Sequence, residues 1–167
     1  PHYIRLLRAL FHPRAEAGPE QALGDVWLPD LQVRVVRRSG MTLAVKGGHN
    51  GESHNHNDVG SFVVYANNQP LLIDVGVGEY TAKTFSSSRY DIWTMQSGYH
   101  NLPKINATDQ KDGKQYAAKF VAQKAGSITL DIANAYPTEA KVEKWLRTIS
   151  ANKKGIIIKD WKVVCLE

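Results

Sequence analysis

Short stretches of alternating apolar and polar residues, each followed by a turn signal, recur through this 167-residue sequence. Residues 31–35 alternate in this way, and residues 41–45 form a second β-rich segment after Ser39-Gly40. A period of two is the pattern of a strand that buries one face, whereas an amphipathic helix repeats every 3.6 residues. The sequence therefore predicts strands over most of its length.

The clearest unit is a hairpin over residues 61–76. Residues 61–66 are rich in β-branched and aromatic types, residues 67–70 (Asn-Asn-Gln-Pro) form a turn sequence, and residues 71–76 are the expected return strand. Further strands are predicted near 116–122, 127–134, 143–150 and 155–165, with turns at Asp112-Gly113, Gly126-Ser127 and Lys154-Gly155. This spacing indicates an all-β fold, namely an antiparallel β-sandwich or part of a larger one.

Two regions are expected along the chain. Residues 1–25 are predicted to be a short helix and a linker, because residues 2–12 have helical spacing and Pro13 ends it. Residues 26–167 are predicted to form the β-sandwich. We expect this domain to be truncated at its C-terminus and the chain to be a piece of a larger protein, because residues 155–167 stop within a predicted strand.

Composition excludes several classes of protein. A single cysteine, Cys165, excludes a disulfide framework and a cysteine-rich zinc module. No apolar run approaches the ~18 residues of a membrane-spanning helix. The formal net charge is +5, and the basic residues flank a locally acidic, His-rich centre. An anionic polymer or plain solvated strand faces would explain this surplus, but nucleic acid is not an expected partner, because no zinc finger, RNP-like motif or basic helix is present.

Histidines concentrate in one short stretch. Three of the six histidines, His49, His54 and His56, fall within eight residues. In an extended segment His54 and His56 would point to the same side. Two imidazoles on one face beside an acidic residue are typical of a site for zinc or iron, although surface histidines in a polar loop would show the same spacing.

A carboxylate within the predicted return strand is the least easily explained residue. Asp74 lies among apolar neighbours, where a carboxylate is costly unless it is paired, hydrogen-bonded or metal-bound. His100 is the next histidine downstream. If Asp74 and His56 are to meet, the chain must bend between His56 and Ser61, and the intervening Asn, Asp and Gly residues permit such a bend.

Together these stretches resemble the central β-domain of the heparinase II/III-like polysaccharide lyases. The resemblance covers about residues 45–110 and rests on Gly48-His49-x4-His54-x-His56-Asn57-Asp58-x2-Ser61-Phe62, the hairpin Tyr65–Gly76 and Tyr99-His100-Asn101. In that family a helical toroid precedes a large β-sandwich, and the substrate cleft lies between the two. The helix predicted over residues 2–12 would be the remnant of such a toroid.

The resemblance implies a role for each matched residue. His56, Asp74 and His100 fall where metal ligands lie. The implied metal is Zn²⁺ in a structural role, and calcium is less suited because it prefers oxygen ligands. His54 falls at an active-site histidine, and Tyr90 lies near an active-site tyrosine of related alginate lyases. We also expect substrate contacts from His49 and from Arg89, whose guanidinium could meet a carboxylate or sulfate.

The activity implied is β-elimination on uronate-containing acidic polysaccharides, such as glycosaminoglycans or alginate. Since the main catalytic residues of the family belong to the toroid, we expect little activity from this chain without its helical domain. Periplasmic, cell-envelope or secreted localisation is expected, with any signal upstream of this sequence.

Three alternatives remain open at this level. A cupin-like enzyme would use Gly48-x5-His54-x-His56, but its later Glu and Pro-x-Gly elements are missing. An iron oxygenase would bind metal through His56, Asp58 and His100, which leaves Asp74 unexplained. A non-catalytic carbohydrate-binding module would use the aromatic residues alone, and it would not need the histidines.

Overall fold

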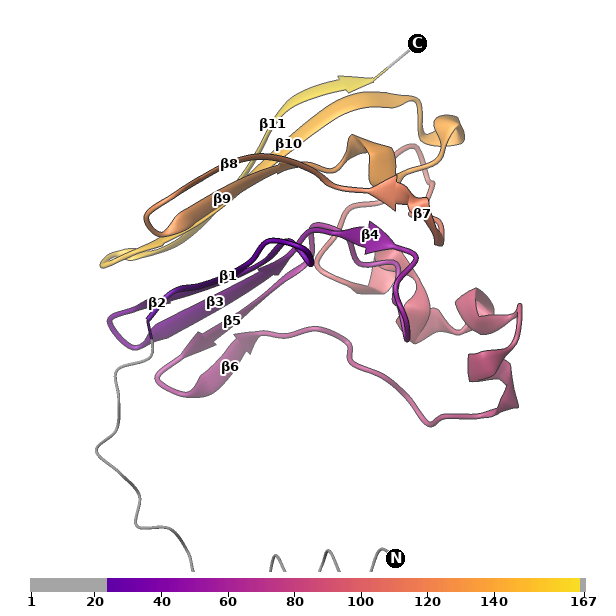
Figure 1. Cartoon of the computed structure of the whole chain (residues 1–167), viewed down its shortest axis with the longest axis horizontal. Coiled ribbons are helices and arrows are strands. Elements are labelled where there is room, and N and C mark those ends of the chain that lie inside the picture. Colours follow the sequence, from indigo (N-terminus) through magenta and orange to yellow (C-terminus); the bar gives the residue numbers. More distant parts are fainter. Residues whose placement is uncertain (1–23, 166–167) are drawn as a thin grey trace, which may run out of the picture.

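A computed structural model describes residues 24–165 and shows two antiparallel sheets packed face to face (Figure 1). The predicted all-β sandwich is confirmed. The helix predicted over residues 2–12, and all of the linker before Gly24, lie outside the described residues. No helix in the described part of the chain is long and apolar enough to span a membrane.

The first sheet has five strands in the order β1-β2-β3-β5-β6. These are β1 (Val26–Leu28), β2 (Val33–Arg38), β3 (Met41–Lys46), β5 (Phe62–Ala66) and β6 (Gln69–Leu72). The second sheet has the order β11-β10-β9-β8, and its strands are β8 (Lys119–Lys124), β9 (Ser127–Asp131), β10 (Val142–Asn152) and β11 (Gly155–Cys165). A small third sheet pairs β4 (His49–Asn50) with β7 (Gly113–Ala117).

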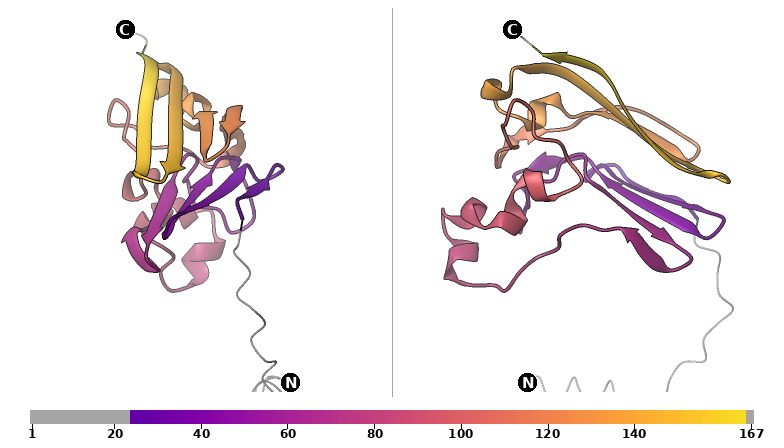
Figure 2. Two further views of the ribbon diagram at one scale, coloured as in Figure 1. Left: turned by 90° about the vertical axis from the view of Figure 1, so that its left-hand side faces the viewer. Right: turned by 180° about the vertical axis from the view of Figure 1, so that it is seen from behind.

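Short 3₁₀ turns gather at one end of the sandwich, near β4 and β7 (Figure 2). Four of them follow β6 along the chain: η1 (Ala82–Phe85), η2 (Arg89–Asp91), η3 (Trp93–Met95) and η4 (Ser97–Tyr99). Two more, η5 (Ala133–Ala135) and η6 (Thr138–Ala140), lie between β9 and β10. The segments that carry the candidate site residues belong to this end.

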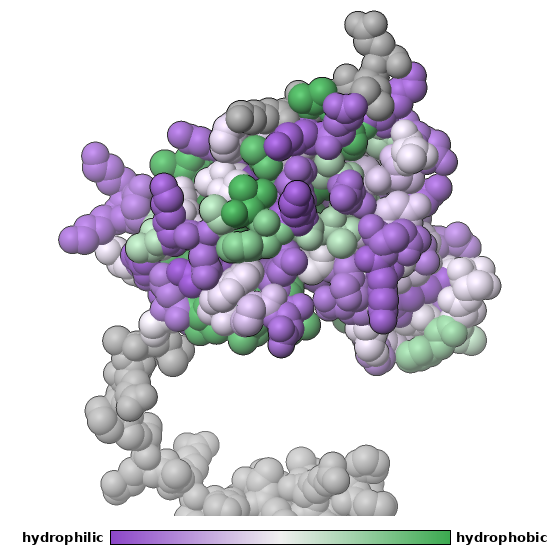
Figure 3. All heavy atoms as spheres, turned by 45° about the horizontal axis from the view of Figure 1, so that its top comes forward, coloured by the Kyte–Doolittle hydropathy of each residue, from purple (hydrophilic) through white to green (hydrophobic). Residues whose placement is uncertain are grey.

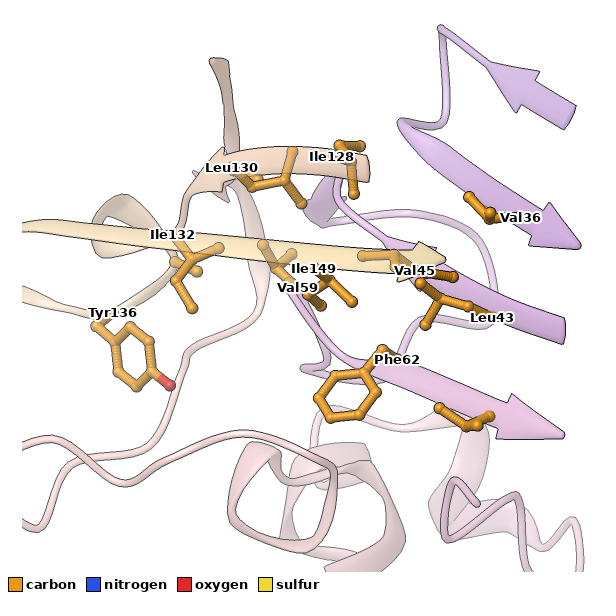
Figure 4. Close-up of a cluster of buried hydrophobic side chains, with 14 of the residues drawn as sticks. Val36, Leu43, Val45, Val59, Phe62, Ile128, Leu130, Ile132, Tyr136 and Ile149 are labelled. Atoms are coloured by element: carbon orange, nitrogen blue, oxygen red, sulfur yellow. The ribbon is translucent and has the colours of Figure 1, made fainter. Parts of the chain in front are cut away.

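The core lies between the two large sheets. Leu43 of β3 is the register partner of both Val36 and Val64, so one face of the first sheet is apolar. These residues pack against Ile128 and Ile149 of the second sheet, in one buried cluster (Figure 4). Alternation along each strand thus places the apolar face inward, as the sequence predicts.

The outer face of the second sheet is mixed in character. Seen obliquely, it carries mainly hydrophilic side chains with smaller groups of apolar ones among them (Figure 3). Ile157 and Trp161 are exposed apolar residues of this sheet, whereas Phe120 lies against Trp27 of the first sheet. Among the tryptophans, Trp27 and Trp145 pack against the core cluster, whereas Trp93 and Trp161 are exposed.

Several element boundaries differ from the predictions. The predicted strand over 31–35 begins at Val33, and Gly113, predicted to lie in a turn, instead starts β7. The strand predicted near 116–122 is divided at Ala118, between β7 and β8, and the one near 127–134 ends at Asp131. The hairpin turn is shorter than predicted, because Asn67 and Asn68 both adopt positive φ and the return strand already starts at Gln69.

Candidate active site

Three short segments, distant in the sequence, meet beside the first sheet. The loop between β4 and β5 carries His56, the segment after β6 carries Asp74, and His100 directly follows η4. Asp74 therefore lies beyond the end of β6 at Leu72, and the prediction that it sits inside a strand is wrong. Its flanking residue Ile73 is exposed, so no buried strand surrounds this carboxylate.

Hydrogen bonds to backbone carbonyl groups explain why these segments converge. The side chain of Asn101 donates to the carbonyl oxygens of Phe62 and Ile73, which ties the segment after η4 to β5 and to the residue before Asp74. The amide of Asn57 donates to the carbonyl of Met95, which ties the His56 loop to η3. In each case the residue that makes the hydrogen bond directly follows a site residue, since Asn101 follows His100 and Asn57 follows His56.

The predicted bend between His56 and Ser61 is present. The Ser61 amide donates to the Asp58 carbonyl, and Gly60 adopts a φ of +89°, a conformation that glycine accepts without a steric penalty. The bend turns the chain into β5. It thereby removes the separation that a straight strand would impose between His56 and Asp74.

His56, Asp74 and His100 form a group with metal-ligand geometry. One ligand atom from each residue lies within 4.8 Å of the others. The Nδ1 atom of His100 and a carboxylate oxygen of Asp74 are 2.6 Å apart, and the ring centroids of His56 and His100 are 5.4 Å apart. This group unites the three residues that the family resemblance implies as ligands.

The protonation states of the group suit a divalent cation. Burial lowers the pKa of His56, and the nearby Asp58 and Asp74 only partly offset it. Burial alone would raise the pKa of Asp74, but hydrogen bonds from His100 and the Gly76 amide outweigh it and lower that pKa. At neutral pH the group therefore offers a neutral imidazole and a carboxylate, the forms that bind metals.

A buried nitrogen in this group has no protein partner. An ionised Asp74 accepts the hydrogen bond from His100 Nδ1, so a neutral His100 carries its lone pair on Nε2. That Nε2 atom is buried and has no hydrogen-bond partner within the described residues. A cation would satisfy it, and two imidazoles with one carboxylate are a donor set that zinc accepts.

Asp58, the ligand that an iron oxygenase would require, lies outside the group. Its carboxylate forms an ion pair with Lys46, and its backbone amide donates a hydrogen bond to Oδ1 of Asn50. The geometry therefore favours Asp74 over Asp58 as the carboxylate of a metal centre.

A second set of predicted residues lines an adjoining hollow of about 300 Å³. His54, Arg89 and Tyr90 lie on its wall together with Phe85 and Thr84. His54 is exposed and has a φ of +57°, so residues 54–56 are not extended. The prediction that His54 and His56 share one face of an extended segment is therefore wrong, and His54 instead lies near the rings of Tyr80 and Phe85.

Two predicted substrate contacts have other structural partners. Arg89 donates from Nε and Nη2 to the Asn55 carbonyl and from Nη1 to the Thr84 carbonyl, so it uses part of its five-donor set within the protein. His49 lies in β4, where its Nδ1 accepts a hydrogen bond from the Gly51 amide. His49 is not among the residues of the hollow.

The family comparison decides the identity of this domain. Residues 21–161 match the family model described as Heparinase II/III-like, C-terminal. The chain belongs to this family. The resemblance inferred from the histidine stretch and the hairpin is thereby confirmed, whereas no curated protein matches the chain significantly.

Solved structures share the fold of this Heparinase II/III-like domain. A crystal structure of a heparan sulfate lyase HepC mutant from Pedobacter heparinus aligns with a TM-score of 0.62 and 18% identity, covering 90% of this chain and 23% of that one. The Heparinase III-BT4657 gene product with methylated lysines gives 0.64 and 18%, covering 95% and 26%. A crystal structure of heparinase III gives 0.60 and 17%, covering 86% and 23%. The chain thus spans about a quarter of the length of these proteins.

Sequence reasoning missed the residues that shape the site. Asn50, Gln110 and Ser97 form a buried polar network beneath the histidine loop, and Tyr80 and Phe85 lie beside His54. The concentration of asparagines around the histidines was a usable signal for the first set. Nothing in the local sequence marks Gln110, which is distant from the loop along the chain.

Proposed function

We propose that this chain is the β-domain of a polysaccharide lyase that cleaves uronic-acid-containing acidic polysaccharides by β-elimination. One observation carries the proposal: in a Heparinase II/III-like domain, the fold places His54 in an open hollow and His56 in the adjacent metal-ligand group, on either side of buried Asn55. His54, the candidate catalytic residue, is thus two residues from His56, whose metal-ligand group would fix the backbone of the loop.

The reaction requires a base at C5 of the uronate and an acid at the leaving O4. The base removes the proton from C5 of the uronate, the C–H electrons form the C4–C5 double bond, and the bond from C4 to the leaving O4 breaks. The acid then protonates O4. Neutralisation of the uronate carboxylate makes the C5 proton acidic enough for this step.

The residues of the hollow suit the substrate side of this chemistry. His54 would act as base or hold the substrate, and Tyr90 on the same wall is the second candidate for proton transfer. Arg89 brings a positive charge to the hollow; its hydrogen bonds reach carbonyl groups, and within the described residues it forms no ion pair with Glu52, the acidic residue on the same wall. An anionic sugar is favoured at such a position.

His56, Asp74 and His100 would hold a zinc ion in a structural role. Bound there, zinc would cross-link the histidine loop, the segment after β6 and the end of η4, and so fix the backbone that carries His54. Calcium fits this group less well because two of the three ligands are nitrogen atoms.

The complete active site would also need the helical domain that the family resemblance implies. The helix predicted over residues 2–12 would belong to it, and residues 26–167 would be the β-domain. We further propose that the protein acts in the periplasm, in the cell envelope or outside the cell, where acidic polysaccharides are accessible.

An elimination assay tests the proposal. The natural gene product, the 167-residue chain and a His54→Ala variant of each would be loaded with zinc and given heparan sulfate or alginate, and the ultraviolet absorbance of the unsaturated product would be followed. We expect activity in the gene product, little in the chain alone, and a loss of about 10²–10⁴-fold on removal of His54. Tyr65→Ala, in β5, is the matched control and should retain activity.

Two results would contradict this expectation. Normal turnover by the 167-residue chain alone would refute the need for a second domain. Absence of unsaturated product from the gene product, on every uronate polymer tried, would refute the lyase assignment itself.

A further inference from the structure

An exposed pair of stacked aromatic rings stands beside the hollow. The rings of Tyr80 and Phe85 have centroids 5.7 Å apart and an interplanar angle of 29°. Tyr80 is 52% exposed and Phe85 is 69% exposed, although aromatic rings in a folded domain are usually largely covered. His54 meets both rings edge-on, with centroid distances of 6.3 and 6.4 Å.

The arrangement is held by a half-buried arginine and not by the rings themselves. Arg89 donates to the carbonyl of Thr84, the residue before Phe85, and to the carbonyl of Asn55, the residue after His54. One guanidinium therefore fixes the backbone on which both side chains sit. Thr84 is buried, and its hydroxyl accepts the Thr81 amide, which closes the turn of η1.

This anchoring fixes the backbone beside Phe85 and His54 before any ligand arrives, and the Phe85 ring stacks on Tyr80. A pre-positioned surface loses little conformational entropy on binding, whereas two free loops would have to be ordered first. Phe85 contributes little to the core at its present exposure. Its fixed position is therefore better explained by a ligand than by stability.

The chemistry of the surface points to a sugar ring. The face of an aromatic ring is electron-rich, and it attracts the weakly positive C–H bonds on the apolar face of a pyranose. Beside the rings the hollow presents the polar groups of His54 and Ser53, which suit hydroxyl groups, and the charge of Arg89, which suits a carboxylate or sulfate on the side of the hollow away from the acidic Glu52. At about 300 Å³, the hollow is at the lower end of the ~300–1,000 Å³ range of ligand sites, a size for one sugar unit.

We propose that Tyr80 and Phe85 form a stacking subsite for one sugar ring of an anionic glycan, next to the position of His54. That this glycan is also the substrate of the protein rests on the proposed function. It would hold the unit adjacent to the one that reacts, and so set which part of the polymer lies against His54.

Binding of a heparan sulfate tetrasaccharide to the full 167-residue chain tests the subsite. Calorimetry would give the affinity, and NMR of the sugar would report upfield ring-current shifts of its C–H protons, which a merely structural role of the rings would not cause. We expect Phe85→Ala and Tyr80→Ala each to weaken binding about fivefold or more and to reduce the shifts. Phe85→Tyr should retain both, because it keeps the ring.

Controls separate stacking from general effects. Tyr65→Ala removes a ring of β5 that is 42% exposed and not in the hollow, so it should leave the affinity unchanged. The melting temperature of each alanine variant should stay near that of the parent, since Tyr80 and Phe85 are exposed. A neutral glucose tetrasaccharide should bind more weakly than the anionic one and should lose the sensitivity to salt that the charge of Arg89 confers.

The outcomes distinguish this subsite from the lyase proposal. Unchanged affinity and shifts in Phe85→Ala and Tyr80→Ala would overturn the subsite, even if the gene product forms unsaturated sugar. Failure of the parent chain to bind the tetrasaccharide would also overturn it. Binding that depends on both rings, without any elimination by the gene product, would uphold the subsite and refute the lyase.

Discussion

Two aspartates of the site show how position decides what a carboxylate does. Asp58 has Lys46 as its ionic partner, and its role is to fix the bend that leads into β5. Asp74 has an imidazole as its partner and lies in the group with His56 and His100. Both residues are partly exposed acids near His56, yet among the described residues only Asp74 lies in the group that could hold a metal ion.

A pair of matched substitutions tests this assignment. Asp74→Asn removes one of the three ligands and should abolish zinc binding at stoichiometric metal. Asp58→Asn leaves all three ligands in place, and its effect should stay within the ~10–100-fold range of second-sphere changes. Competition with a chromogenic chelator gives both affinities. Loss of zinc in Asp58→Asn with retention in Asp74→Asn would reverse the assignment and support the oxygenase ligand set.

At the scale of elements, the loop between β4 and β5 is ordered by side-chain amides. Gln110 acts as a strand partner for Val59, because its Oε1 accepts the Val59 amide and its Nε2 donates to the Val59 carbonyl. The same Oε1 accepts from the Asn50 side chain, and the backbone amide of Gln110 donates to Ser97. A buried residue outside the loop thereby holds the histidine loop and η4 together.

Removal of this side chain should weaken both stability and metal binding. Gln110→Ala leaves the Val59 amide and carbonyl unpaired in the interior, for an expected loss of about 2–4 kcal/mol in the free energy of unfolding. Because the loop carries His56, zinc affinity should fall about tenfold or more. Urea denaturation and metal titration measure the two effects, with Gln123→Ala on the exposed surface of β8 as the control.

A fall in stability with unchanged zinc affinity would show that Gln110 supports the fold without positioning His56. No change in either quantity would contradict the network as a whole. The control variant should match the parent in both measurements.

The sequence predicts the strands well and the connections poorly. Alternation and turn residues identify β2, β3, β5 and the long hairpin of β10 and β11, because these properties are local. The conformation of residues 54–56 is not local, since a positive φ at His54 depends on Asn55 being held by Arg89 and by the Asn50 carbonyl. The metal-ligand group was predictable through family resemblance, whereas Gln110 and the Tyr80–Phe85 pair required the structure.

At the scale of the whole molecule, one buried arginine connects the second sheet to the site. Arg147 of β10 forms two hydrogen bonds with the carboxylate of Asp160 on β11, each 2.8 Å long. Its Nη1 atom also donates to the carbonyls of Gly60 and Asn101, which flank the His56 loop and His100. The side chain therefore joins β10 and β11 of the second sheet to two site segments through one charge.

This connection should make the domain sensitive to acid. Burial by itself would raise the pKa of Asp160, but the hydrogen bonds and charge of Arg147 outweigh it and hold that pKa below its ordinary value of 3.8. The unfolded chain thus binds a proton at a higher pH than the folded one. The stabilisation is complete above pH ~4 and is lost as the pH falls through the folded value.

Asp160→Asn should remove this dependence. At pH 7 the variant leaves the buried Arg147 without its carboxylate and should lose about 1–3 kcal/mol of unfolding free energy. Below the folded pKa the parent carboxyl is also neutral, so the two stability curves should converge there. Urea denaturation at a series of pH values from 7 downward measures this.

Asp91→Asn is the control, because Asp91 is an exposed residue whose only close cation in the described chain is Lys83 at 4.0 Å. If the two curves stay parallel down to the lowest pH, the ion pair with Asp160 contributes nothing to the free energy of unfolding, and Arg147 is held by the carbonyls of Gly60 and Asn101 alone.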